Sequence, residues 1–434
     1  MSAASSASAH PHGAVREVFS NGCVLLTKRI RGARHASLCV AVRIGSRYEP
    51  LALAGISHLL EHMLFRGTKE HPTSYAQNFA FESLGGTLDA ATSVDSTVYQ
   101  ATLPPEAVPT AIELIAEMFR APVMAHLTLE RNVVREEILD TLDENDQLID
   151  ADELTAQALF GKDGLARPIG GTLQSIDAIT EADLRAWHAS HYVGANLVCV
   201  VAGAFPASTR ATFKKTFGAL PAGTKAVRPP LSSAKVHRET FTPATGSQVD
   251  VRVAFRAPLA ARSPRSMAFS MLSRILDDGM SARVFRTLVE DRGLAYEAFG
   301  GLDIYPDVAA LVLGASCRPE STALAVEALL ELAREVRESV SKEELQRVRT
   351  RVRFELDLLR DDPQAMGEIL LEDEFHGEAT SLDEIARRAA AVTTKDVVRV
   401  AQQFLTPEAL AVVAVGRLES GVLRKLKKAA RGFA

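Results

Sequence analysis

The sequence predicts an α+β fold of two homologous domains, each an α/β sandwich in which a mixed, largely antiparallel sheet packs against a helical layer. Three observations predict this fold: the chain length, an internal repeat, and the order of strand-like and helix-like segments. The chain has 434 residues, of which 47% are hydrophobic and 24% are charged, an ordinary balance for a globular protein. At about 100–200 residues per domain, this length favours two domains.

The internal repeat is clearest in two helix–strand segments, residues 179–203 and residues 392–416. Each begins with a threonine suited to cap a helix, continues with helical periodicity, and ends in a β-rich strand that stops at glycine. The two segments lie 213 residues apart. A second pair of similar helices, at 111–119 and 325–333, lies 214 residues apart. Several pairs of similar segments in the same order indicate an internal duplication.

The repeat implies the domain boundaries. We expect residues 1–15, which are rich in Ser and Ala, to be a disordered tail. Residues 16–220 and residues 237–434 are the two expected domains. Residues 221–236 are rich in Pro, Gly and Ser, and we interpret them as a linker.

The order of elements within the first half supports a sheet covered by helices. In chain order, strand-like segments at 22–30 and 36–46 are followed by a helical segment at 55–65, a strand-like segment at 88–103, and helical segments at 106–119 and 127–144. Two strands, a helix, further strands and then several helices are typical of an α+β sandwich.

Charge and cysteine content exclude some classes of protein. The formal net charge of −5 argues against a nucleic-acid-binding protein, because such proteins depend on positive charge. The cysteines lie far apart with no Cys-x-x-Cys pair, so we expect buried free thiols rather than disulfides or a cysteine metal site. They are Cys23, Cys39, Cys199 and Cys317.

Membrane and targeting signals are weak. No segment reaches the ~18 consecutive apolar residues that a transmembrane helix needs, and the opening residues lack the apolar core of a secretory signal. We therefore expect no membrane span and a bacterial cytoplasmic location, with the mitochondrial matrix and the periplasm left open.

The helical segment at 55–65 contains a His-x-x-Glu-His pattern formed by His58, Glu61 and His62. Positions i, i+3 and i+4 share one helix face, so both imidazoles can bind one ion with the glutamate beside them. This is the inverted form of the His-Glu-x-x-His motif of zinc peptidases. Such short patterns also arise by chance on solvated helix faces, and the spacing alone leaves that alternative open.

A third ligand is expected from the segment at 127–144. Glu137 shares a helical stripe with Glu130, because seven residues make nearly two turns. Glu136 points about 100° away and is the poorer candidate. We therefore predict Glu137 as the ligand and Glu130 as a carboxylate that steadies the site through hydrogen bonds.

Residues 44–68 resemble the metal-binding core of the pitrilysin/insulinase zinc metallopeptidases, the inverzincins. The resemblance continues at residues 84–103, 130–138, 167–203 and 279–301, in the order expected for the family. It covers most of the chain and includes the duplication. It is closest in form to the half-length, two-domain branch that contains the mitochondrial processing peptidase subunits and their bacterial homologues.

The resemblance implies a zinc-dependent endopeptidase or oligopeptidase with one Zn2+ per chain. His58, His62 and Glu137 in the first domain would bind the zinc, and the second domain would bind none. Zinc lowers the pKa of a bound water toward ~7 and polarises the scissile carbonyl. Glu61 would be the general base, and Glu130 would belong to the same catalytic site.

The resemblance also implies that a peptide substrate adds as a strand to a sheet edge, here residues 86–92. The substrate-binding residues would be Gly86, Asp89, Ala90, Ala91 and Thr92. Asp89 departs from the family, which usually has Asn there. The exchange replaces a donor with an acceptor, and a preference for basic peptides, weaker binding and a purely structural effect all remain open.

A second departure concerns a Tyr/Arg pair. Active members of the family place an arginine seven residues before a tyrosine, and both contact the substrate or the tetrahedral intermediate. Tyr296 matches the tyrosine, but Val289 stands in the arginine position and cannot donate a hydrogen bond to an oxyanion. Arg286 and Arg292 are each three residues out of register and are expected to point away.

The chain length bears on assembly. Single-chain relatives close four such domains around the substrate, so a two-domain chain is expected to dimerise. An intact metal motif beside an incomplete Tyr/Arg pair favours the zinc-bearing subunit of a heterodimer, whose homologous partner supplies that pair. Two alternatives remain open: a self-sufficient homodimeric peptidase that uses Arg286 or Arg292, and a non-catalytic scaffold subunit of the same fold.

Overall fold

The computed structural model describes residues 6–231, 235–261, 263–377 and 379–433. Its chain forms two compact units. Unit 1 comprises Met1–Ile138, Arg167–Pro230 and Leu356–Leu382, and unit 2 comprises Leu139–Ala166, Leu231–Glu355 and Asp383–Ala434.

In the described residues, unit 1 is built on a seven-stranded sheet with the order β1-β2-β3-β7-β4-β6-β5. Neighbouring strands are antiparallel except β3 and β7, which are parallel. The strands are β1 Ser6–Ala9, β2 Val15–Val18, β3 Val24–Arg29, β4 Ala36–Val42, β5 Leu88–Thr92, β6 Thr97–Leu103 and β7 Leu197–Gly203.

Unit 2 is built, over the same described ranges, on a five-stranded sheet with the order β10-β11-β9-β12-β8. Its neighbours are antiparallel except β12 and β8, which are parallel. The strands are β8 Glu239–Pro243, β9 Val249–Ala257, β10 Ala295–Ile304, β11 Ala309–Cys317 and β12 Leu410–Gly416.

The two sheets repeat one topology. From β3 onward the first sheet runs β3-β7-β4-β6-β5, and the second runs β8-β12-β9-β11-β10 with its parallel pair at the same place. Strands β7 and β12 end at Gly203 and Gly416, both at positive φ. The helices before them begin with the same Thr–Asp capping box. The predicted duplication and the mixed, largely antiparallel sheets are confirmed.

Helices cover both sheets. Those that lie wholly or almost wholly in unit 1 are α1 Ile56–Leu64, α2 Ser74–Glu82, α3 Val108–Arg120, α4 Leu127–Leu139, α6 Leu173–Ala178, α7 Glu181–His191, α8 Thr209–Lys215 and α13 Pro363–His376. Those of unit 2 are α5 Ala151–Phe160, α9 Ser266–Leu276, α10 Arg283–Phe285, α11 Thr322–Glu338, α14 Leu382–Ala391, α15 Thr394–Phe404 and α16 Ser420–Arg431. Helix α12, Lys342–Asp361, begins in unit 2 and ends in unit 1.

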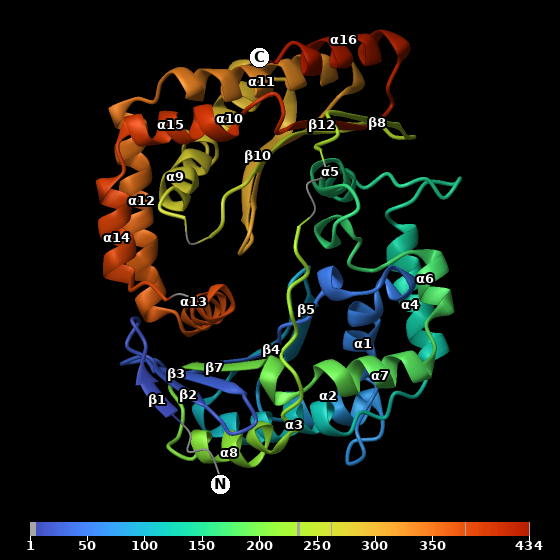
Figure 1. Cartoon of the computed structure of the whole chain (residues 1–434), viewed down its shortest axis with the longest axis vertical. Helices are drawn as coiled ribbons and strands as arrows, with labels where there is room; N and C mark the ends of the chain where they lie inside the picture. The colour runs from blue at the N-terminus through green and yellow to red at the C-terminus, as the bar shows by residue number, and fades with distance from the viewer. Residues whose placement is uncertain (1–5, 232–234, 262, 378, 434) are drawn as a thin grey trace. The chain divides into compact units, whose positions relative to one another are not determined.

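Each sheet packs against a helix from the other half of the sequence. Helix α5 precedes the second sheet in the chain but packs on its strands β9 and β12, and α13 from the second half packs on β4 and β7 of the first sheet (Figure 1). A Cβ on Gly367 of α13 would lie 3.3 Å from the hydroxyl oxygen of Ser37 on β4. The absence of a side chain at this glycine therefore permits the close approach of helix and strand.

The central strand β4 is covered on both faces. Ser37 and Cys39 face α13, and the next residues along the strand point to the opposite face because side chains alternate in a strand. There Tyr99, which pairs with Val40, contacts Phe119 of α3 with ring centroids 5.0 Å apart. Every residue of β4 is buried, which explains why the strand reads as a nearly continuous apolar run.

The units differ from the contiguous domains expected at 16–220 and 237–434. A sequence repeat marks where equivalent elements begin, but it does not show on which sheet each helix packs. The expected disordered tail at 1–15 also differs, since residues 6–9 form β1 and pair with β2. Residues 1–5 of that tail and residues 232–234 of the expected linker lie outside the described residues.

The cysteines are buried and free, as expected. None of the described helices is both long enough and apolar enough to cross a membrane.

Candidate metal centre

Helix α1 carries the His-x-x-Glu-His pattern and begins at a glycine that no other residue could replace without strain. Gly55 has φ +88°, and a Cβ there would lie 2.4 Å from the carbonyl oxygen of Gly170. On the inner side of α1, Leu59, Leu60 and Met63 are completely buried. The helix is therefore fixed by packing on one side, and its two histidines project from the other.

The first amides of α1 are capped by a side chain from outside the helix. The carboxylate of Glu49 accepts hydrogen bonds from the amides of Gly55 at 2.7 Å and Ser57 at 2.8 Å. These amides have no partner within the helix, so Glu49 satisfies them. Burial raises the pKa of Glu49 to about 7, although both backbone hydrogen bonds act in the opposite direction. The sequence does not predict this role of Glu49, because it shows only an acid six residues before the glycine, and the burial of that acid is visible only in the structure.

The predicted ligands lie together at distances that suit one ion. The Nε2 atoms of His58 and His62 are 3.3 Å apart. Glu137 on α4 places Oε2 3.6 Å from Nε2 of His58 and Oε1 3.8 Å from Nε2 of His62. Two ligand atoms bound to one tetrahedral zinc stand about 3.3–3.6 Å apart, because each bond is close to 2 Å. The three side chains therefore fit a shared zinc ion with small adjustments.

The supporting carboxylate lies where the helical stripe of α4 predicts it. Glu130 is buried, and its Oε2 lies 3.1 Å from Nδ1 of His62. Its other oxygen pairs with Arg66. Such a contact fixes the orientation of an imidazole and directs its Nε2 toward the ion.

The ring of His58 is also prepared to bind a cation. Its pKa is lowered to about 4, first by burial and then by the nearby charge of His62. Its buried Nδ1 has no hydrogen-bond partner among the described residues. At neutral pH the ring is uncharged and can offer a nitrogen lone pair to a metal.

Glu61 connects α1 with strand β5. Thr92 donates a hydrogen bond from Oγ1 to Oε2 of Glu61 at 2.6 Å. Burial raises the pKa of Glu61, while this hydrogen bond and the charge of His62 lower it. A carboxylate held next to the ligand set, with a pKa above its usual value, suits a proton acceptor.

Strand β5 is the edge strand of its sheet and pairs with β6 on one side. Gly86 lies just before it, and a Cβ there would lie 2.4 Å from the carbonyl oxygen of Thr102. Asp89 and Ala91 are exposed, while Ala90 and Thr92 are half-buried. The structure thus places all five predicted substrate-binding residues along or beside one sheet edge.

A pocket of about 250 Å³ opens beside this edge in unit 1. Its apolar lining includes Phe65, Phe81 and Leu88, and two carboxylates, Glu82 and Asp89, also line it. The aspartate that departs from the family therefore adds negative charge to a pocket next to β5.

Tyr296 lies in unit 2 near the start of β10, where the pairing with β11 shifts between Ala295 and Glu297. It is the extra residue of a bulge, and 90% of its surface is exposed. Arg292, which precedes the strand, pairs with Glu331 at 2.7 Å. The tyrosine is available to a ligand, and Arg292 is directed to α11.

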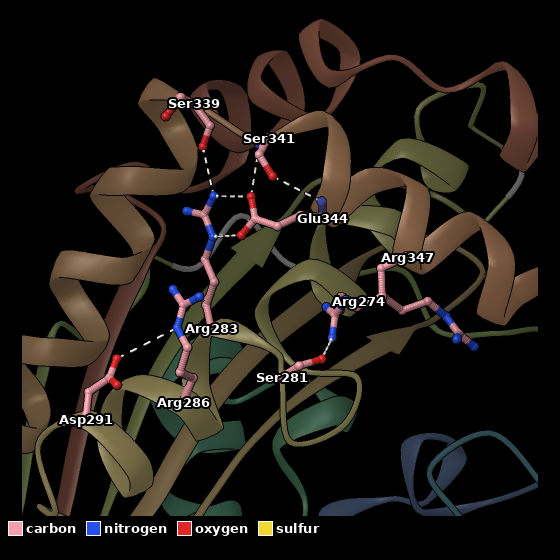
Figure 2. Close-up of polar contacts among 9 residues, drawn as sticks. All are labelled: Arg274, Ser281, Arg283, Arg286, Asp291, Ser339, Ser341, Glu344 and Arg347. Atoms are coloured by element: carbon pink, nitrogen blue, oxygen red, sulfur yellow. Dashed lines mark hydrogen bonds and ion pairs between the residues drawn. The ribbon is translucent and has the colours of Figure 1, made fainter.

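Val289 lies in a π-helical turn, η7, at Arg286–Asp291. Figure 2 shows Arg286 facing Asp291, with 3.8 Å between Nε and Oδ2. It also shows the buried Arg283, whose Nε and Nη2 donate to the carboxylate of Glu344 at 2.7 and 2.9 Å. This ion pair fixes the segment before η7 to α12, whereas both side chains of the Arg286–Asp291 pair are more than half exposed.

Comparison with known proteins gives consistent matches. A family profile described as "Insulinase (Peptidase family M16)" matches residues 24–173, which include every predicted zinc ligand. A second profile, "Peptidase M16 inactive domain", matches residues 178–352, which include Val289 and Tyr296.

Curated relatives match along most of their length. An uncharacterized zinc protease of Mycobacterium tuberculosis is 30% identical over 402 residues, which cover 90% of each chain. The uncharacterized zinc protease YmxG of Bacillus subtilis is 29% identical over 413 residues, covering 92% of this chain and 97% of YmxG. Among solved structures, a protease from Helicobacter pylori has a TM-score of 0.86 at 19% identity, over 93% of this chain and 99% of that one. The structural match shows a shared fold.

Proposed function

Because the chain belongs to the insulinase-type peptidase family M16, we propose that it is a zinc-dependent endopeptidase or oligopeptidase that hydrolyses extended peptides at the candidate metal centre. Relatives named zinc proteases support the general class. The single observation that supports this assignment most is the set of 3.3–3.8 Å distances among His58, His62 and Glu137.

The donor set is appropriate for zinc, since two imidazoles and one carboxylate leave a fourth position open. Zinc bound there supplies Lewis acidity that activates water and polarises the scissile carbonyl. Glu61 takes the proton from the attacking water and delivers it to the leaving amine. Thr92 holds Glu61 in place, and Glu130 orients His62.

The edge of β5 supports extended peptides as the substrate class. Main-chain groups of Gly86–Thr92 would pair with the main chain of the peptide, which is common to all sequences. Side chains then contribute selectivity through neighbouring pockets. The pocket lined by Glu82 and Asp89 would favour a basic side chain over an acidic one.

We further propose that the chain acts as the zinc-bearing subunit of a heterodimer. Val289 cannot donate a hydrogen bond, and Arg292 is engaged by Glu331. A homologous partner with an intact Tyr/Arg pair would supply the missing cation. A self-sufficient homodimer is the second candidate. Arg286 is exposed and its ion pair with Asp291 is weak, so it could leave Asp291 and take the place of the missing arginine.

The first test separates metal binding from proton transfer. We expect Glu61→Gln to retain zinc and to lose peptide cleavage by at least about 10²-fold, because a glutamine cannot accept the water's proton. We expect His62→Ala to lose both zinc and cleavage. Zinc per chain is measured by elemental analysis. Cleavage is measured with a quenched fluorescent peptide, for the chain alone and together with a homologue that carries the Tyr/Arg pair.

A scaffold subunit of the same fold predicts the opposite result. Such a chain would show no cleavage in any combination, and its assembly would be indifferent to both substitutions. Full cleavage by Glu61→Gln would instead retain the peptidase assignment and reject Glu61 as the base.

A further inference from the structure

A second cluster of potential metal ligands lies in unit 1, outside the candidate metal centre. One ligand atom each from His10, His12 and Asp373 lies within 4.8 Å of the other two. The histidines belong to the turn between β1 and β2, and Asp373 belongs to α13. The cluster therefore joins the N-terminal turn to the helix contributed by the second half of the chain.

The turn is held in one conformation by the main chain. The amide of His10 donates to the carbonyl of Ala14 at 2.8 Å, and the amide of Gly13 donates to the carbonyl of His10 at 2.8 Å. Lys28 donates from Nζ to the carbonyl of His12 at 2.6 Å. Both imidazoles are thus presented from a braced backbone, which suits a site that must hold a fixed geometry.

Glu374, the residue after Asp373 on α13, pairs with two arginines. Glu374 accepts hydrogen bonds from Arg16 at 2.7 and 3.0 Å and from Arg43 at 3.0 Å. Asp373 instead faces His12, with 2.7 Å between Oδ2 and Nε2. The two adjacent carboxylates have different roles: Glu374 docks the helix, and Asp373 faces the imidazoles.

His12 is fully buried beside Asp373. Its side chain has no exposed surface, and its Nδ1 has no hydrogen-bond partner among the residues that the structure describes. Because Nε2 of His12 faces Asp373, an ion in this cluster would take Nε2 from His12, and the burial of the ring shields that position from solvent.

We propose that His10, His12 and Asp373 form a second zinc site, which clips the N-terminal turn to α13. Two imidazoles and a carboxylate are the ligand types that zinc takes. Ligand atoms around a tetrahedral zinc stand about 3.3 Å apart. The 2.7 Å contact between His12 and Asp373 would therefore open and the wider distances in the cluster would shorten, by side-chain movements of the order of 1 Å. The role is structural, and it does not depend on the proposed peptidase activity.

The test uses the full chain without a polyhistidine tag, in a His58→Ala/His62→Ala background that removes the candidate metal centre. After saturation with zinc and removal of free metal, we expect about one zinc per chain. Adding Asp373→Asn should lower the zinc affinity by at least about tenfold, as loss of a ligand does. Zinc should also slow amide hydrogen exchange of residues 6–18 in the His58→Ala/His62→Ala protein. It should not do so when Asp373→Asn is added.

Glu374→Gln is the matched control, since it weakens docking of α13 without removing a ligand. It should keep its zinc. His10→Ala, which changes the turn and leaves α13 intact, should lose zinc as Asp373→Asn does. The proposal is overturned if the background protein binds no stoichiometric zinc, if Asp373→Asn and His10→Ala retain it, or if Glu374→Gln loses as much as Asp373→Asn.

Discussion

At the scale of single residues, opposing effects act on the pKa of Glu61, the proposed base. Burial raises its pKa, and the hydrogen bond from Thr92 lowers it. The same hydrogen bond, 2.6 Å long, fixes the direction of the carboxylate. In the proposed mechanism Thr92 therefore has two roles, as part of the peptide-binding edge and as the residue that positions the base.

We expect Thr92→Val to lower kcat about tenfold with KM little changed. A hydrogen bond to a charged group contributes about 1.5 kcal/mol, and β5 pairs with peptide through its main chain, which valine preserves. Thr92→Ser keeps the hydroxyl and should restore kcat. Steady-state kinetics on both variants provide the check; an increase in KM alone would assign Thr92 to substrate binding only.

At the scale of elements, α1 depends on a cap that comes from outside the helix. Glu49 is buried and accepts two amide hydrogen bonds at the start of α1. Its pKa in the folded chain is about 7, above the ordinary value of 4.5. Since the folded state binds the proton more tightly, protonation of Glu49 favours folding, and this contribution is lost as the pH rises from about 4.5 through 7.

The predicted consequence is a stability difference that depends on pH. Relative to Glu49→Gln, the wild type should lose about 3 kcal/mol of unfolding free energy between pH 4.5 and pH 8, as a pKa raised by this amount implies. Urea denaturation of both proteins across this pH range gives the difference between their unfolding free energies. The titrations of all other groups are common to both proteins and cancel in this difference. Glu106→Gln, an exposed position, is the control and should run parallel to the wild type. If the unfolding free energy of Glu49→Gln changes with pH as that of the wild type does, the pKa of Glu49 is not raised.

At the scale of the whole molecule, the chain is a duplicated pair of sheets with exchanged helices. Because α5 and α13 each pack on the sheet of the other half, neither half of the sequence contains all the elements of its unit. The metal motif lies in the first half and the Tyr296 segment in the second. The proposed heterodimer would add a homologous partner's Tyr/Arg pair to this metal motif.

We expect the lone wild-type chain to cleave peptides slowly and Val289→Arg to raise its kcat/KM by about 10²-fold, because one well-placed donor to an oxyanion is worth about that much. Val289→Gln, similar in size to arginine's stem and uncharged, is the control. Adding a homologue that carries the Tyr/Arg pair should raise the activity of the wild type toward that of Val289→Arg.

The homodimer alternative makes a different prediction. In that case the lone wild type is already fast, Val289→Arg changes little, and Arg286→Ala or Arg292→Ala abolishes cleavage. Unchanged activity in both arginine variants would remove this alternative.

Much of the fold and of the candidate site could be predicted from local pattern. The i, i+3, i+4 spacing places His58, Glu61 and His62 on one face, and the seven-residue spacing places Glu130 and Glu137 on one stripe. The repeat of 213 residues predicted matching strands, which β7 and β12 confirm. These predictions succeed because helix and strand periodicity are properties of neighbouring residues.

Other features could not be predicted, because they depend on contacts between distant residues. Nothing in the sequence near His10 and His12 indicates that Asp373, 361 residues from His12, lies beside them. The same holds for Thr92 and Glu61, which are 31 residues apart. Such contacts depend on the direction that the chain takes after each loop, and a single sequence does not reveal that direction.

The sequence by itself determined the class of fold and the duplication, and it singled out the candidate metal ligands, because each is a matter of spacing and residue type. Only the tertiary structure decided which helix covers which sheet, how Glu49 and Thr92 hold the candidate metal centre, and that an N-terminal turn meets α13. The same local patterns are compatible with many tertiary contacts, because the hydrophobic effect is non-directional. The packing of the whole chain determines which of these contacts form.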